Sequence, residues 1–221
     1  MPIKIEGAVS NVGADVGGTT FRGLHVHVKP LEYGSLGHYR TSVKIAMATS
    51  QNANSRLFEV RNTHVSNLLV LTRQRIMVGP AGTVTTAYLG EFALFKLTSF
   101  SAVDTTNAVT PITSVKRGSM AAYPGSAAVR HCTLAGAAAG MTGGTLTKDA
   151  QAAAQIIVPL ATLAAGSAFV REELVDDPAG THPYVFAQNE GWEIENVVAG
   201  SATANVVHVV IDSSWAEVTA F

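Results

Sequence analysis

Charged residues are scarce in this chain. Only 14% of its 221 residues are Asp, Glu, Lys or Arg, where about 25% is usual for soluble domains. Hydrophobic residues make up 47%, so the chain has few polar side chains with which to cover its surface. This composition favours partners that cover part of the protein. The formal net charge of −1 supplies no basic field, so we expect no nucleic-acid partner.

Cysteine and long apolar runs are nearly absent as well. The single cysteine, Cys132, excludes an intramolecular disulfide framework and fits a chain that folds in a reducing cytoplasm. No run of about 18 apolar residues occurs, so we expect no membrane partner. Residues 1–6 have no apolar core and do not form a signal-peptide pattern.

What the chain does contain is a series of short alternating runs bounded by glycine, proline and small polar residues. Runs of this kind are typical of β-strands. One such run is residues 39–47, where Tyr39, Thr41 and Val43 face one way and Arg40 and Ser42 the other. The further strands are expected at residues 24–29, 56–61, 68–78, 88–100, 110–116, 127–134, 168–175, 184–187, 191–198 and 205–215.

Residues 56–100 form the centre of the expected sheet. Long strands rich in branched and aromatic residues flank residues 79–82, Gly-Pro-Ala-Gly, which we interpret as a hairpin loop. The apolar phase slips between Leu94 and Phe95. Either both faces of the strand are buried there, or the strand contains a bulge.

Helix signals are almost missing. The only candidate is residues 148–157, where Asp, Ala and Gln include good helix formers, and Pro159 would end it. Strand-rich chains with turn signals and no interleaved helices favour an all-β fold. We therefore predict an antiparallel β-sandwich or jelly roll, with a glycine-rich extended arm over residues 1–20 and very little helix. Residues 21–221 would form one domain, with an Ala/Gly-rich insertion at residues 133–160.

One glycine-rich stretch could bind phosphate. Residues 15–20, Asp-Val-Gly-Gly-Thr-Thr, resemble the phosphate-contacting loop of sugar kinases, in which backbone N–H groups approach the phosphate. In that family the loop follows a buried strand, whereas residues 9–14 form a poor strand here. We interpret the stretch as a turn of the arm.

The histidines offer little metal chemistry. His25 and His27 would share one face of a strand and could ligate a metal together, but no third ligand can be assigned, so we interpret them as a polar strand face. The remaining histidines have no partner that the sequence identifies: His38, His64, His131, His182 and His208.

Other reactive groups also have structural interpretations. Cys132 lies in an Ala/Gly-rich stretch and is expected to be a buried or half-buried thiol. The acidic pairs at residues 172–173 and 176–177 match no EF-hand loop, and no Gly-x-Ser-x-Gly elbow occurs. Four aromatic residues could form a sugar-binding platform but more often belong to a sandwich core or interface: Trp192, Trp215, Tyr39 and Tyr184. We expect no catalytic, cofactor-binding or metal-binding residue, and no enzyme.

Three pieces of the chain resemble β-rich structural proteins of tailed bacteriophages. They are residues 31–40, residues 57–62 with the strands that follow to residue 100, and residues 186–194 with residues 211–217. The resemblance is closest to jelly-roll capsid decoration (cement) proteins. It implies a virion protein, assembled in the host cytoplasm, that forms a homo-oligomer (a trimer) and binds the major capsid protein.

The alternatives are a major capsid or tail/neck protein of the virion, then a host-glycan-binding module, then a small hydrolase. A glycine-rich arm can add a strand to the sheet edge of a neighbour. We therefore expect residues 1–20 and residues 133–160 to make contacts between subunits.

Overall fold

The computed structural model describes residues 37–85, 87–109, 115–116, 127–132, 140–160, 169–176, 183–201 and 206–219. All of them belong to one compact unit, Ser35–Phe221. The expected arm, the strand with His25 and His27, the glycine-rich residues 15–20, and His182 lie outside the described residues. Among the described residues there is no helix, and hence none long and apolar enough to cross a membrane.

The described residues form strands that alternate between two layers. The strands are β1 (Gly37–Ala46), β2 (Ser55–Asn62), β3 (Leu68–Pro80), β4 (Tyr88–Ala102), β5 (Ala108–Val109), β6 (Val115–Lys116), β7 (Ala127–Cys132), β8 (Thr145–Lys148), β9 (Ala154–Leu160), β10 (Val170–Asp176), β11 (Tyr184–Phe186), β12 (Gly191–Asn196) and β13 (Val207–Val218).

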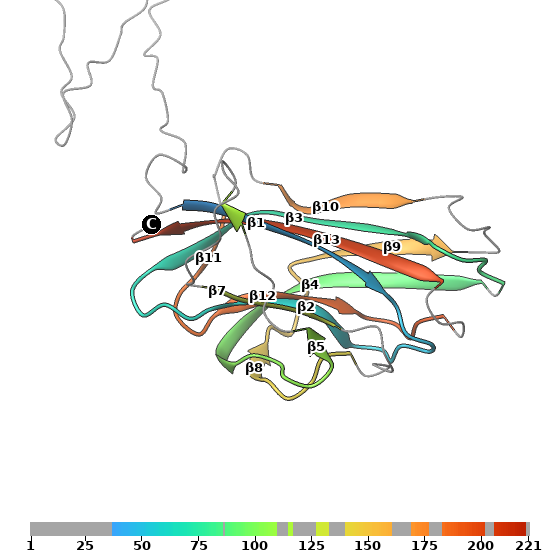
Figure 1. Cartoon of the computed structure of the whole chain (residues 1–221), viewed down its shortest axis with the longest axis horizontal. Coiled ribbons are helices and arrows are strands. Elements are labelled where there is room, and N and C mark those ends of the chain that lie inside the picture. Colours follow the sequence, from blue (N-terminus) through green and yellow to red (C-terminus); the bar gives the residue numbers. More distant parts are fainter. Residues whose placement is uncertain are drawn as a thin grey trace, which may run out of the picture. The chain divides into compact units, whose positions relative to one another are not determined.

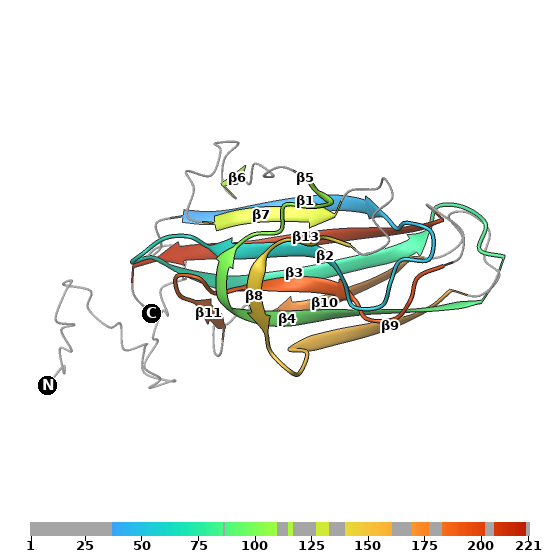
Figure 2. The ribbon, with the colours of Figure 1, turned by 90° about the horizontal axis from the view of Figure 1, so that it is seen from below.

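Two antiparallel sheets pack face to face (Figures 1 and 2). Sheet I has the order β10-β3-β13-β1-β6, with β11 also paired to β3, and sheet II has the order β5-β7-β2-β12-β4-β8, with β9 also paired to β4. Within them, β1-β13-β3-β10 lies against β2-β12-β4-β9. Successive strands of this set change sheet except for the pair β4 and β9, and this is the strand order of a jelly roll. The predicted antiparallel β-sandwich is confirmed.

Strand alternation explains the two layers. In β1 the even-numbered residues from Arg40 to Lys44 are exposed, while Tyr39, Thr41 and Val43 are buried. The same alternation continues in its neighbour β13, which pairs with β1 from Gly37 to Ala46. Each sheet therefore has one apolar face. Because burying apolar surface is favourable, the two apolar faces pack against each other and form the core.

Aromatic side chains occupy the centre of this core. Trp192 of β12 and Trp215 of β13 are both fully buried, and their rings meet edge to face with centroids 6.0 Å apart. Phe186 extends the group at 5.0 Å from Trp192, and Tyr39 at 6.4 Å from Trp215. The indole N–H of Trp192 donates to Gln74 Oε1 at 3.1 Å, so its polar atom is satisfied inside the core.

The predicted hairpin at residues 79–82 is wrong. Gly79 and Pro80 are the last residues of β3, and β3 and β4 lie in different sheets. Their long partners are β13 for β3 and β12 for β4. The chain therefore crosses between the layers here, and the apolar faces of the two strands contribute to opposite walls of the core.

The predicted helix at residues 148–157 is also wrong. Lys148 ends β8, and β9 begins at Ala154. Between them, the N–H groups of Asp149 and Ala153 donate to carbonyls of β4, at Lys96 (3.0 Å) and Leu94 (2.8 Å). Pairing with β4 thus overrides the helix propensity of the alanines. Within the described ranges β9 pairs with β4 alone, so Pro159 lies in an edge strand, where proline is tolerated.

Two local features refine the strand predictions. The register of β4 against β12 runs unbroken from Phe92 to Leu97, so the phase slip reflects burial of both faces and not a bulge there. In β10 the register against β3 does shift between Glu173 and Val175. Regular alternation would place Val175 on the same face as Glu173, but because of the shift Val175 packs in the core.

Candidate functional site

The aromatic residues that could have formed a sugar platform lie mostly in the core. Trp192, Trp215 and Tyr39 are all buried, and Tyr184 is half-buried against the core cluster. Packing against one another, they present no coplanar surface. The interpretation of these side chains as core residues is confirmed for the three that are buried.

The thiol and histidine candidates are dispersed. Cys132 is buried at the end of β7, and this burial raises the pKa of its thiol to about 11, which opposes a nucleophilic role. His64 Nδ1 accepts the N–H of Asn67 at 2.9 Å in the β2–β3 turn. His208 lies on the outer side of sheet I, where burial, and then Lys44, lower its pKa. No group of three or more His, Cys, Asp or Glu side chains with metal-binding geometry occurs within the described ranges.

Polar side chains instead gather in two places, one on the outer face of each sheet. On sheet II, residues 102–108 and 140–149 fold over the outer face of β2 and β12, and we name these residues the cover. Its strands β5 and β8 lie below β2 and β12 in Figure 1, on the side away from sheet I, and Figure 2 shows β8 crossing in front of them. Thr106 and Thr142 form a bridge between the two halves of the cover.

The cover is bound to β2 through backbone and carboxylate contacts. The N–H of Met141 donates to the carbonyl of Arg56 at 3.0 Å. Asp104, which is fully buried, accepts the N–H of Gly144 at 2.7 Å and pairs with Arg56 Nε at 3.1 Å. Its own N–H donates to Glu59 Oε1 at 2.9 Å. A side chain at Gly144 would collide with Asp104, since an added Cβ would lie 2.5 Å from Oδ1.

Glu59 and Asp104 are therefore two neighbouring buried carboxyl groups with one arginine between them and solvent. Burial raises the pKa of Glu59 to about 8, and the charge of Asp104 adds to the effect, while Arg56 opposes it. Two adjacent carboxylates cannot both ionise cheaply in a dry site, so the pair holds a proton at neutral pH.

A second carboxyl pair lies on β12. Glu193 is fully buried, and Glu195 is 3% exposed. Lys148 of the cover binds Glu195 Oε2 at 2.6 Å and lies 4.3 Å above the ring of Phe95. Burial, followed by the charge of Glu195, raises the pKa of Glu193 to about 9.

The oxygens of Glu193 accept no hydrogen bond in this arrangement. A protonated Glu193 can itself donate to Glu195, which resolves this shortage of donors. Raised carboxyl pKa values are a common sign of acid–base catalysis, but these groups are sealed under the cover. The arrangement can act as a proton-holding contact that fixes the cover to the sheet.

Sequence reasoning missed this site. Glu59 alternates with Phe58 and Val60 in β2, and the polar positions of such a strand are usually exposed to water. The cover comes from residues more than 40 positions further along the chain, since Asp104 follows Glu59 by 45 residues. Only the even spacing of Glu193 and Glu195 along one strand could have indicated a shared acidic row.

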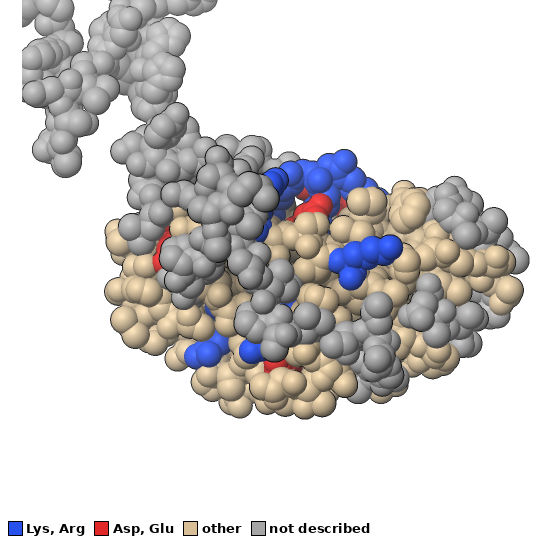
Figure 3. Space-filling view, viewed as in Figure 1, with Lys and Arg blue, Asp and Glu red and all other residues tan. Residues whose placement is uncertain are grey.

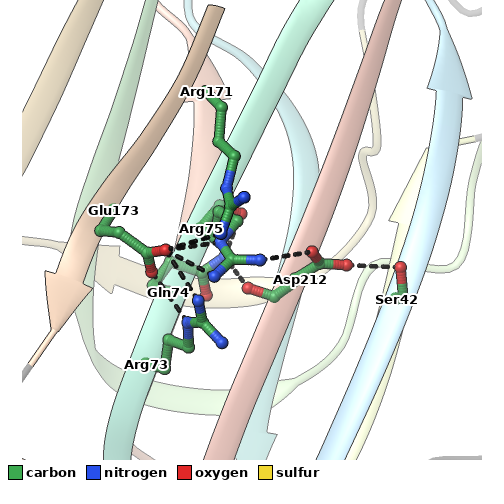
Figure 4. Close-up of polar contacts among 7 residues, drawn as sticks. All are labelled: Ser42, Arg73, Gln74, Arg75, Arg171, Glu173 and Asp212. Carbon is green, nitrogen blue, oxygen red and sulfur yellow. Dashed lines mark hydrogen bonds and ion pairs between the residues drawn. The ribbon is translucent and has the colours of Figure 1, made fainter. Parts of the chain in front are cut away.

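The outer face of sheet I carries a second polar group, which we name the cationic face. It consists of outward-facing side chains on β1, β3, β10 and β13: Arg40, Lys44, Arg73, Arg75, Arg171, Glu173 and Asp212. Figure 4 shows most of these side chains meeting across three strands. In Figure 3, blue side chains with red among them gather at the top, over β10 and β3.

Glu173 is the centre of this network. Arg73 binds it with two nitrogens, Nε to Oε2 at 2.8 Å and Nη2 to Oε1 at 2.7 Å. Arg75 Nε reaches Oε1 at 2.6 Å, and Arg171 Nη2 reaches it at 3.4 Å. Arg75 also lies 3.9 Å from Asp212, which accepts the hydroxyl of Ser42 at 2.5 Å. Three guanidinium groups thus share one carboxylate (Figure 4).

Of the acidic candidates, Glu173 lies in the paired strand β10, within the strand expected at residues 168–175.

Comparison of the chain with protein-family models, with curated proteins and with solved structures finds no match.

Proposed function

We propose that this chain is a non-enzymatic structural protein of a virion, a capsid decoration (cement) protein that binds the phage head and stabilises it through contacts between subunits. The observation that supports this most is the two-sheet scaffold, in which the cover lies over the outer face of sheet II and the outer face of sheet I carries exposed charged side chains. The jelly roll is a frequent architecture of viral capsid domains, although lectins use it too. The resemblance of residues 31–40, 57–100, 186–194 and 211–217 to phage structural proteins supports the same function.

The side chains with unusual chemistry favour a structural role. The buried carboxyls of Glu59 and Glu195 bind the cover, the Cys132 thiol is buried, and the tryptophans fill the core. Fold alone does not establish function, so the head-binding role, the homotrimer and the virion location are proposals that rest on the resemblance.

A major capsid or tail/neck protein is the nearest alternative, because the same sandwich serves shells that assemble by themselves. A glycan-binding module is a more distant alternative. It would need an exposed aromatic platform, and burial of Trp192 and Trp215 removes the two largest candidates.

The test is the mass of the purified protein in solution, measured by light scattering with and without empty heads from the source virus. A small oligomer, three chains by this proposal, that joins preformed heads supports the decoration role. Closed particles formed by the chain alone would make it a shell protein. A protein that ignores heads and binds an immobilised glycan array would overturn the proposal in favour of the glycan-binding module.

A further inference from the structure

Among the residues that the structure describes, the cationic face has more positive than negative side chains. Five cations, Arg40, Lys44, Arg73, Arg75 and Arg171, face two carboxylates, Glu173 and Asp212. The chain as a whole has a net charge of −1, so this face differs in sign from the rest of the molecule.

The excess is greatest on β1. Arg40 and Lys44 are exposed, and neither forms an ion pair or a side-chain hydrogen bond within the part of the chain that the structure describes. The arginines of β3 and β10 also keep donors to spare. A guanidinium group has five N–H donors, and Arg171 uses one of them, in a long contact of 3.4 Å, while its side chain is 55% exposed.

The strand register fixes the relative positions of the side chains on this face. Cross-strand register aligns Glu173, Arg75, Asp212 and Ser42 in one row, and Arg171, Met77, Val210 and Lys44 in the next. Adjacent strands lie about 4.8 Å apart, so the cations form a grid of fixed positions. The ion pairs with Glu173 hold the arginine side chains in place before any partner arrives, which lowers the ordering cost of binding.

We propose that the cationic face is the surface by which this protein docks on an acidic surface of a partner protein. Under the proposed function, on which the identity of the partner rests, that partner is the shell of the head. Arginine forks are suited to carboxylates, and a cationic grid with carboxylates interspersed complements a protein surface of mixed but mainly acidic charge. Nucleic acid is the poorer fit, because Glu173 and Asp212 would repel phosphates.

The test uses a variant that removes two positive charges from side chains that form no ion pair within the described part of the chain. In the full-length protein, Arg40→Gln combined with Lys44→Gln lowers the net charge by two and leaves every described ion pair intact. The matched control, Thr145→Glu combined with Gln155→Glu, makes the same change in net charge at exposed positions of β8 and β9 in sheet II. Circular dichroism and thermal unfolding establish that both variants fold.

Binding is measured by co-sedimentation with empty heads, and by fluorescence titration with poly-L-glutamate and with duplex DNA as separate probes. We expect the β1 variant to bind heads and poly-L-glutamate about tenfold more weakly at low salt, and the control to bind as the wild type does. About 0.5 M salt should remove most of the difference, because it screens exposed charges.

Each alternative result has one meaning. Equal head binding by the β1 variant and the wild type would overturn the docking face while leaving the decoration role standing. A wild-type protein that ignores heads would overturn the decoration role, and the poly-L-glutamate titration would then decide the face alone. Tighter binding to duplex DNA than to poly-L-glutamate, lost in the β1 variant, would assign the face to nucleic acid and overturn the proposal.

Discussion

The outer faces of the two sheets carry similar side chains in opposite environments. On sheet II, Glu59 and Glu193 are fully buried beneath the cover. On sheet I, the Glu173 side chain is 29% exposed and three arginines reach it. Both sets occupy the outward positions of alternating strands, so strand periodicity places them identically. What separates them is whether a distant segment of the chain covers the face.

This difference shows where an ionised side chain lowers the stability of this molecule. A carboxylate at the surface keeps its hydration and pairs with arginines for a modest gain. A carboxylate under the cover loses hydration and must be protonated or matched by a buried cation. The raised pKa values of Glu59 and Glu193 follow from that loss. The outer face of sheet II is therefore buried under the cover, whereas the charged side chains on the outer face of sheet I remain exposed and can contact a partner.

Removing one arginine from each face should separate them most strongly. Arg56→Met leaves Asp104 buried without its cation, and we expect a loss of about 3 kcal/mol in the free energy of unfolding at pH 7. Arg73→Met removes one of three cations around an exposed carboxylate, and the loss should be below about 1 kcal/mol. Urea unfolding of both variants measures the contrast. Equal losses would mean that the cover does not isolate Asp104 from water.

Much of the sheet architecture was accessible from sequence, because local alternation reports which side of a strand is buried. Residues 39–47 alternate without a break, and β1 follows that pattern. The long run at residues 205–215 likewise became β13. Such patterns identify strands and their inward faces, and the scarcity of helix signals then favours a sandwich.

The connections between strands could not be predicted from the sequence. Gly79 and Pro80 fit a hairpin as well as a crossing between layers, because the same turn residues serve both. Ala154 begins a strand despite alanine's helix propensity, since β4 supplies pairing partners that no local window contains. The buried carboxyls were missed for the same reason: the contact between Glu59 and Asp104 joins segments that only the folded topology brings together.

Alkaline pH should weaken the cover and leave the cationic face unaffected. Because the folded-state pKa values of Glu59 and Glu193, about 8 and about 9, lie above the usual 4.5, the folded protein binds more protons than the unfolded chain. Their stabilising contribution is complete below about pH 4.5 and is lost as pH rises through the folded-state values. For Glu193 alone we expect a fall on the order of 2 kcal/mol between pH 7 and pH 9.

Unfolding free energies of wild type and Glu193→Gln across this range measure the effect. The amide cannot ionise, so the variant should lose less stability on raising the pH. Asp212→Asn, on the exposed face, provides the control and should follow the wild-type profile. Hydrogen exchange at residues 140–149 should rise first if ionisation releases the cover. An identical pH profile for Glu193→Gln and wild type would contradict the assignment of a proton to this carboxyl pair.

The smallest effect is expected at the centre of the cationic face. Glu173→Gln removes the carboxylate that three arginines share, yet the exposed guanidinium groups regain hydration, so the loss should stay near 1 kcal/mol or below. It should be larger at low salt, where the three cations repel one another, and shrink in about 1 M salt. Urea unfolding at both salt concentrations measures this dependence. A loss that salt does not change would indicate that Glu173 stabilises the fold through packing and not through its charge. The contrast between the two outer faces would then concern their exposure and not the contribution of their charges to stability.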